Sequence, residues 1–241
     1  IIHNGDDEIP TIAPVTFVLT RGPLVTVRYF DPRPFAMLME KLDREPTLCA
    51  TGADLFLNLM EAIIDRASDV LARTATRVEA ISGHIFNDRK ALGFDKLIVK
   101  LGRAQTANAR IDQSLSGLSR VFAFVSLDDG IENKGEAKAH LKTLSRDALS
   151  LIGHNHSVAA SINFQLSAAL GLINIEQSSI IKIFSVAAVA FMPPTLIASI
   201  YGMNFEHMPE LSWPVGYPLA VLAMIIAAIL PLAWFKRKGW L

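Results

Sequence analysis

Residues 183–205 read IFSVAAVAFMPPTLIASIYGMNF and contain no Asp, Glu, Lys or Arg. At about 1.5 Å per residue, a helix of this length spans the roughly 30 Å hydrocarbon core of a bilayer. A second uncharged stretch, residues 211–235 (LSWPVGYPLAVLAMIIAAILPLAWF), follows a loop that carries Glu206 and Glu210. The sequence therefore predicts two transmembrane helices joined by a short acidic loop.

Composition and aromatic placement support this prediction. The chain is 51% hydrophobic and only 19% charged, which is too apolar for an ordinary soluble domain. Tryptophans and tyrosines prefer the membrane interface, and most of them lie near the ends of the two stretches: Trp213, Trp234, Trp240, Tyr201 and Tyr217. A buried helical hairpin in a soluble core would not place them there, so we expect a lipid bilayer around both helices.

Charge and motif content exclude several other classes of protein. Lys plus Arg (23) equals Asp plus Glu (23), which leaves no basic field for nucleic acid. The single cysteine, Cys49, cannot form a disulfide within the chain or a thiolate cluster, as expected in a reducing compartment. The sequence has no phosphate-binding loop, no nucleophile motif and no pair of carboxylates typical of catalysis. We expect neither an enzyme nor a bound cofactor.

Basic residues flank the two stretches on one side only. Lys182 precedes the first stretch and Lys236, Arg237 and Lys238 follow the second, whereas the connecting loop has no Lys or Arg. The positive-inside rule then puts both chain ends in the cytoplasm and the loop outside.

The first 46 residues predict the end of a cytosolic α/β domain. Residues 16–20 and 24–30 are β-branched and aromatic runs joined by Arg21-Gly22-Pro23, a pattern typical of a hairpin. Because two strands are not stable alone, we expect the rest of their sheet upstream of Ile1, where the chain opens without Met. Pro34 begins a short helix through Lys41.

Residues 47–181 predict cytosolic antiparallel helices and a stalk helix. Apolar positions recur at helical spacing from Ala53 to about Asn87 and again over residues 111–125. A third helix starts near Lys134 and meets no strong breaker before the membrane segment, residues 182–241. The fold class predicted is a mainly α membrane protein in which a long stalk helix runs into the first of two transmembrane helices.

A stripe of small and polar residues follows the 3–4 step of this helix from Ser157 to Ser199. A face turned to lipid would carry Leu and Val, so this stripe faces protein or water. Helix packing and pore lining explain it equally well. Its membrane members are Ser178, Ile181, Ser185, Ala188, Met192, Thr195 and Ser199.

The turn after the first span favours the pore. Gly202-Met203-Asn204, the loop sequence Met-Pro-Glu-Leu at 208–211 and the basic tail resemble the CorA family of divalent-cation channels. The resemblance covers the whole chain and implies a homopentamer in the inner (plasma) membrane, with five copies of the first span around the pore. It also implies that about the first third of a usual member lies outside this sequence.

The resemblance implies a selectivity filter at Gly202, Met203 and Asn204. Mg²⁺ gives up its waters reluctantly, so a ring of Asn204 carboxamides suits the hydrated ion, which it would contact through water. Glu206 and Glu210 would concentrate cations at the mouth, although solvated loop carboxylates explain them equally well. Many members carry Asn where this chain has Ser178, and many sense cytosolic Mg²⁺ through carboxylates that the stalk around Ser167 lacks.

Two further features concern closure of the pore. Met192, together with the level of Ile181 and Phe184, is a candidate hydrophobic gate that excludes water, with ordinary packing favoured for Phe184. Lys182 with Lys236, Arg237 and Lys238 forms a candidate basic collar, which lipid-headgroup anchoring explains as well.

The resulting prediction is passive influx of a divalent cation, Mg²⁺ or also Co²⁺ and Ni²⁺, through a homopentameric pore. A proton-coupled Zn²⁺ transporter of the same superfamily is the first alternative. The second, from another class, is a two-span signalling or scaffold protein whose stripe only packs helices.

Overall fold

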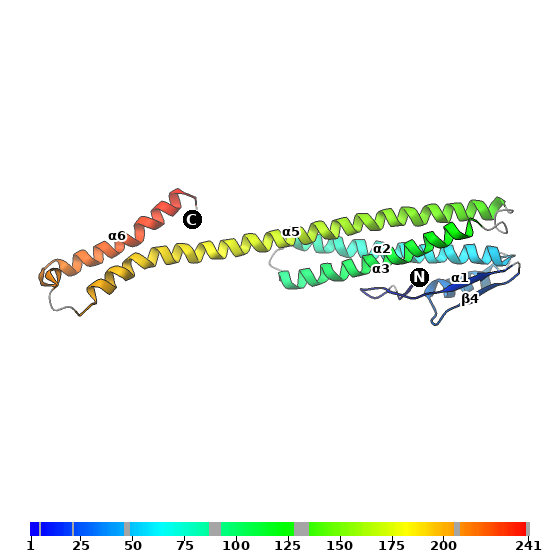
Figure 1. Ribbon diagram of the computed structural model, residues 1–241, viewed down its shortest axis with the longest axis horizontal. Helices are drawn as coiled ribbons and strands as arrows, with labels where there is room; N and C mark the ends of the chain where they lie inside the picture. The colour runs from blue at the N-terminus through cyan, green and yellow to red at the C-terminus, as the bar shows by residue number, and fades with distance from the viewer. Residues whose placement is uncertain are drawn as a thin grey trace. The chain divides into compact units, whose positions relative to one another are not determined.

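The computed structural model describes residues 1–4, 6–20, 22–45, 49–86, 93–127, 135–204 and 208–239 (Figure 1). The chain divides into two compact units, Ile1–Ala169 and Leu170–Leu241, which are described separately. The first unit holds the strands and most of the helical core, and the second holds the candidate membrane segments.

Four short strands begin the first unit. β1 (Ile2–Asn4) pairs antiparallel with β2 (Thr11–Ile12), and β3 (Thr16–Leu19) pairs antiparallel with β4 (Leu24–Val27). The β3–β4 register aligns Thr16 with Val27 and Leu19 with Leu24, which confirms the predicted hairpin. The β1–β2 pair was not predicted, because so short a pair gives no alternating pattern to read.

Helix α1 (Arg33–Arg44) confirms the short helix expected from Pro34 and extends it at both ends. Proline suits the first turn of a helix because its missing N–H would have no partner there. The helix is amphipathic and buries Pro34 and Leu38, while Lys41 and Arg44 lie in its last turn, where positive charge offsets the helix dipole.

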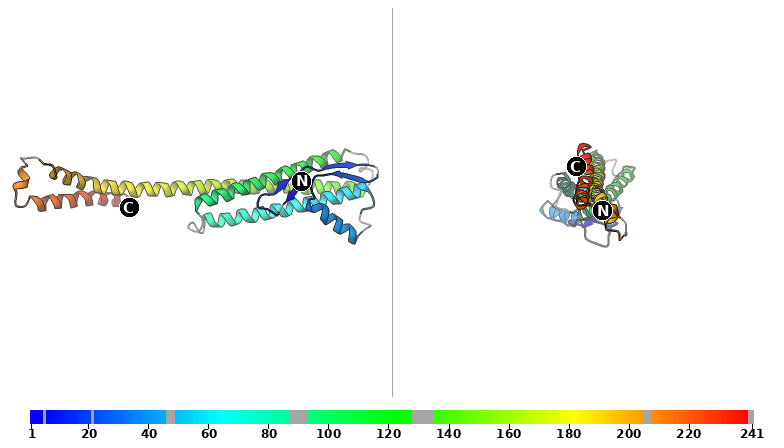
Figure 2. Two further views of the ribbon diagram at one scale, coloured as in Figure 1. Left: turned by 90° about the horizontal axis from the view of Figure 1, so that it is seen from below. Right: turned by 90° about the vertical axis from the view of Figure 1, so that its left-hand side faces the viewer.

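Helices α2 (Gly52–Phe86) and α3 (Phe94–Val125) form a long antiparallel pair, seen lengthwise in the left view of Figure 2. Thr51 and Asp54 cap the start of α2 reciprocally: the Thr51 backbone N–H donates to the Asp54 carboxylate (2.9 Å), and the Asp54 N–H donates to the Thr51 hydroxyl (3.2 Å). The apolar positions predicted for this pair are buried: Leu59, Ile63, Val70, Val78, Ile81, Ile85, Ile111, Leu115, Leu118 and Phe122. Val125 is the exception and is only half-buried.

Helix α5 (Gly135–Tyr201) is the predicted long helix, and its first half belongs to the first unit. Two fully buried amides join it to its neighbours there. Asn155 Nδ2 donates to the Asp112 carboxylate (3.2 Å) and to the Asn108 carbonyl of α3 (3.4 Å), and Gln165 Nε2 donates to the Val78 carbonyl of α2 (3.1 Å). These bonds fix the register of α5 on both helices.

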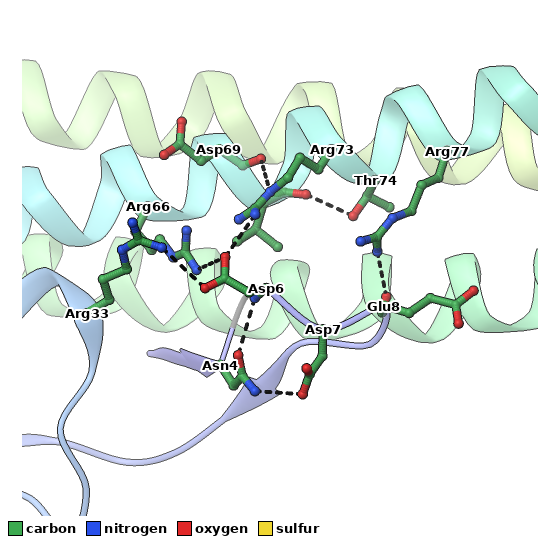
Figure 3. A network of polar contacts seen from close by, with 11 residues as sticks. Asn4, Asp6, Asp7, Glu8, Arg33, Arg66, Asp69, Arg73, Thr74 and Arg77 are labelled. Carbon is green, nitrogen blue, oxygen red and sulfur yellow. Dashed lines mark hydrogen bonds and ion pairs between the residues drawn. The ribbon is translucent and has the colours of Figure 1, made fainter.

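A cluster of arginines binds the loop between β1 and β2, as Figure 3 shows. The Asp6 carboxylate accepts bonds from Arg66 (2.8 Å), Arg73 (2.9 Å) and Arg33 (3.2 Å), which come from α2 and α1. Hydrogen bonds from Arg66 and Arg73 hold the pKa of Asp6 well below its usual range. We call this arrangement, with Asp6 at its centre, the arginine clasp, and it ties the first strands to the helices.

The second unit contains the rest of α5, a short 3₁₀ helix η2 (Pro209–Ser212) and α6 (Gly216–Arg237). Among the described residues, α5 and α6 are the two helices long and apolar enough to cross a membrane, and very little of their apolar windows is buried. The second uncharged stretch was expected to be helical from residue 211, but residues up to Ser212 form η2 and α6 begins at Gly216. The reason is the close backbone turn at Gly216.

Candidate functional site

The stripe predicted along the first span is exposed throughout the subunit. Ser178, Ile181, Ser185, Ala188, Met192, Thr195 and Ser199 all have solvent-exposed side chains. At 100° per residue they occupy one face of α5. The Thr195 hydroxyl donates to the Phe191 carbonyl (2.7 Å), which leaves its oxygen lone pairs free to accept from water.

The opposite face of α5 is covered. Val186 and Ala190 are buried, and Pro193 and Ile197 are half-buried. This covered face lies about 140° from the centre of the stripe. Besides α5, the described elements of this unit are η2 and α6, so we infer that α6 covers it. The stripe therefore lies on a part of α5 that α6 does not cover, together with flanking residues such as Phe191 and Leu196.

The candidate gate residues differ in where they lie on α5. Met192 and Ile181 lie within about 10° of the centre of the stripe, whereas Phe184 lies about 70° to one side. All three side chains are largely exposed in the subunit, at 68%, 57% and 71% respectively. Met192 and Ile181 thus share the open face, and Phe184 lies at its edge.

Helix α5 ends in a tight turn at Gly202. The Gly202 N–H donates to the Ala198 carbonyl (2.9 Å), and the Met203 N–H donates to the Ile200 carbonyl (3.3 Å). A Cβ atom at Gly202 would lie 3.1 Å from that Ala198 oxygen, a closer approach than side chains normally make. Asn204 follows directly with an exposed side chain, so its carboxamide is available to a ligand in solution.

Gly216 explains why α6 starts late. A Cβ atom there would lie 2.4 Å from the Glu210 carbonyl oxygen, and the same oxygen accepts the Trp213 N–H (3.3 Å). The backbone therefore folds back on η2 before α6 can begin, and only glycine permits this approach.

A hollow of about 380 Å³ lies between the end of α5, η2 and the start of α6. Tyr201, Trp213 and Tyr217 line it together with Gly202 and Glu210. Sequence reasoning placed these aromatic residues at the membrane interface but did not predict that they share one hollow beside the turn. The available signal was that each tyrosine stands next to a glycine, Tyr201 before Gly202 and Tyr217 after Gly216. Glu206 lies outside the described residues.

The proposed basic residues do not form one cluster by direct contact. Lys182, Lys236, Arg237 and Lys238 are exposed. The Lys238 ammonium lies 5.9 Å from the Trp234 ring centre, a cation–π distance suited to the membrane interface. The basic collar that Lys182 forms with these three residues stays a prediction.

The donor groups suit a hydrated ion better than a dehydrated metal. The described part of the chain contains no group of three or more His, Cys, Asp or Glu residues able to hold a metal ion. The oxygen donors along the stripe and at its end are hydroxyls and the Asn204 carboxamide. Such neutral groups hydrogen-bond a hydration shell without binding the ion tightly.

A long helix that becomes the first of two candidate spans and is followed by Gly202-Met203-Asn204 indicates a two-span membrane protein. The family model for the CorA-like Mg²⁺ transporter protein matches residues 1–237, and the chain belongs to this family. The chain is 37% identical over 238 residues to the magnesium transport protein CorA of Haemophilus ducreyi, covering 98% of this chain and 74% of that protein. It is also 37% identical over 227 residues to the CorA protein of Wolinella succinogenes, covering 94% and 70%.

Solved structures show the same fold. The complete CorA magnesium transporter from Methanocaldococcus jannaschii matches with a TM-score of 0.78 at 20% identity, covering 90% of this chain and 68% of that one. The full-length CmaX protein matches with a TM-score of 0.71 at 16% identity, covering 90% and 65%. These comparisons confirm the predicted family and the mainly helical fold with its long helix and second apolar helix. The family is one of transporters, as expected for a chain without catalytic motifs.

Proposed function

We propose that this chain is the subunit of a Mg²⁺ channel, a homopentamer whose pore is lined by the exposed stripe of α5. Membership of the CorA-like Mg²⁺ transporter family supports the cargo. The observation that carries the proposal is the stripe itself, which lies opposite the covered face of α5 and leads to the exposed carboxamide of Asn204. An open face with this composition is unfavourable in lipid unless it packs against protein or lines a water-filled path.

The filter in this proposal is the ring of Asn204 side chains. Gly202 permits the close turn, and Met203 packs, because a thioether is too soft a ligand for Mg²⁺. Glu210 at the mouth raises the local cation concentration. Both chain ends lie in the cytoplasm and the channel resides in the inner (plasma) membrane, so the membrane potential drives influx. A doubly charged ion gains about 4.6 kcal/mol per 100 mV.

Reconstitution tests the proposal directly. The full-length protein in liposomes loaded with a Mg²⁺-sensitive dye should take up Mg²⁺ when an inside-negative potential is imposed, and Co²⁺ or Ni²⁺ should compete. Liposomes without protein are the control. Absence of uptake for all three ions would leave the signalling or scaffold class, in which the stripe only packs helices.

The Zn²⁺ alternative makes a different prediction in the same liposomes. A proton-coupled transporter would move Zn²⁺ only across a pH gradient, whereas a passive channel responds to the membrane potential. The Met-Pro-Glu-Leu sequence at residues 208–211 favours the Mg²⁺ type.

A further inference from the structure

The first unit carries two charged rows on opposite flanks of α5. Lys138, Lys142 and Arg146 follow one another at four-residue intervals on α5, and we call them the basic row. Glu61, Asp65 and Asp69 have the same spacing on α2 and, with Asp147 of α5, form the acidic ridge. Viewed down α5, Lys142 and Asp147 lie about 140° apart, on either side of the buried face formed by Leu141, Leu144 and Ala148.

Two residues of the basic row, Lys142 and Arg146, are exposed and form no ion pair with any described residue. Within the ridge, the Glu61 carboxylate lies 3.8 Å from His140. Burial raises the pKa of Asp65, and the like charges of Glu61, Asp69 and Asp147 raise it further, with only partial relief from Lys41.

The rows match in height along the helices. Helices α2 and α5 run in the same direction, because Glu61 lies beside His140 and Val78 beside Gln165. Glu61 is therefore level with the segment between Lys138 and Lys142. Each four-residue step rises about 6 Å on both helices, so Asp65, one step beyond Glu61, stays within about a turn of the Lys142–Arg146 segment.

The basic row also borders a hollow. This hollow, of about 470 Å³, lies between the end of α3 and the start of α5, and Leu141, Lys142 and Arg146 are among the residues that line it. Charge is thus complementary between one flank of the unit and the other. A contact between unlike flanks of identical subunits is head-to-tail, and repeated around a rotation axis it closes a ring.

We propose that the acidic ridge of one subunit docks on the basic row of the next, so that these rows form the cytosolic contact between neighbouring subunits. The inference rests on the proposed ring of identical subunits. A rotation axis along α5 keeps every residue at its height, so each Asp65 meets the Lys142–Arg146 segment of the neighbouring copy. The crowding of carboxylates in an isolated subunit is relieved when this contact forms.

Charge reversal tests the contact in the full-length protein in detergent. Lys142→Glu with Arg146→Glu should lower the subunit association constant about tenfold, because repulsion replaces several pairs that attract only modestly at the surface. Glu61→Lys with Asp65→Lys should do the same. Combining all four substitutions restores attraction and should return the pentamer fraction, measured by native mass spectrometry, to that of the parent protein.

A matched control is available on α3. Lys96→Glu with Lys100→Glu reverses two exposed charges at the same spacing but outside both rows, and should leave assembly unchanged. Raising the salt concentration should weaken assembly of the parent protein and abolish the difference from the row variants. The contact is overturned if the row variants assemble as well as the control variant at low salt. It is also overturned if the variant with all four substitutions does not regain the pentamer fraction of the parent protein.

Cross-linking separates this inference from the proposed function. In a Cys49→Ser background, subunits carrying Asp65→Cys and one tag are co-expressed with subunits carrying Lys142→Cys and another tag. A short bifunctional thiol reagent should give a dimer with both tags. A pentamer that transports Mg²⁺ but gives no mixed dimer would overturn the contact alone. A protein that forms no ring would overturn the contact and the proposed function together.

Discussion

At the scale of single residues, the exposed carboxamide of Asn204 is the group on which we expect the selectivity of the proposed channel to depend. Asn204→Ala removes an oxygen that can accept from hydrated Mg²⁺ and removes little buried area, since the side chain is exposed. We expect uptake to fall to the level of empty liposomes while assembly is unchanged. Asn163→Ala, an exposed asparagine of α5 in the other unit, is the matched control. Normal uptake by Asn204→Ala would refute the filter.

The glycines give a second residue-scale prediction. Gly216→Ala places a methyl group 2.4 Å from the Glu210 carbonyl oxygen and should disrupt the turn before α6, lowering both melting temperature and transport. Gly102→Ala meets nothing within 4 Å in the middle of α3 and should stabilise the protein by about 0.5–1 kcal/mol. Thermal unfolding in detergent compares the two. Equal shifts in the same direction would contradict this account of Gly216.

At the scale of elements, the arginine clasp predicts a pH dependence. The lowered pKa of Asp6 means that its ionised form is favoured in the fold, so its contribution to stability is present above the ordinary carboxyl value of 3.8. That contribution is lost as the pH falls through the lower folded-state pKa. Asp6→Asn should therefore reduce the melting temperature at pH 7, and the difference from the parent should shrink at acid pH. Asp7→Asn, outside the arginine contacts, is the control.

The apolar position in the middle of the stripe gives another prediction. Met192 presents a large apolar side chain to the proposed path, where a narrow unpolarised segment excludes water. Met192→Ser should raise resting Mg²⁺ flux several-fold. Phe191→Ser, an equally exposed position about 100° away on α5, should not. If Met192→Ser is silent and Lys182→Ala raises the flux, the gate is the basic collar.

The elements were largely predictable because their signals are local. Apolar periodicity predicted α2 and α3, since positions such as Ile63 and Leu115 recur wherever a helix packs on one face. Helix α5 was predicted because no strong helix breaker follows Lys134 before the membrane segment. The start of α6 was not predictable in this way, because it depends on a contact between Gly216 and the Glu210 carbonyl that hydropathy does not record. The arginine clasp was not predicted either, because it depends on contacts between residues far apart in sequence, such as Asp6 and Arg73.

At the scale of the whole molecule, the number of subunits decides whether the stripe encloses a pore. Single cysteines at Ser178, Ser185 or Ser199 in a Cys49→Ser background should cross-link into ladders that end at five, because cyclic symmetry brings identical residues around one axis. Gel electrophoresis after graded cross-linking reads the end point. A ladder that ends at two would contradict the pentamer. The number five rests only on the resemblance of the sequence to a family, because the composition of one helix face does not indicate how many subunits surround a pore.

The two buried amides of α5 limit how the cytosolic helices can move. Sliding or turning the first half of α5 would leave Asn155 and Gln165 without the partners they have on α3 and α2, at about 1–3 kcal/mol for each unpaired group. Because of this penalty, small translations or rotations of this part of α5 are unfavourable. We therefore expect residues 135–165 to move together with α2 and α3. Opening and closing of the proposed path would then involve α5 beyond Gln165, the part that bears Pro193 and Pro194.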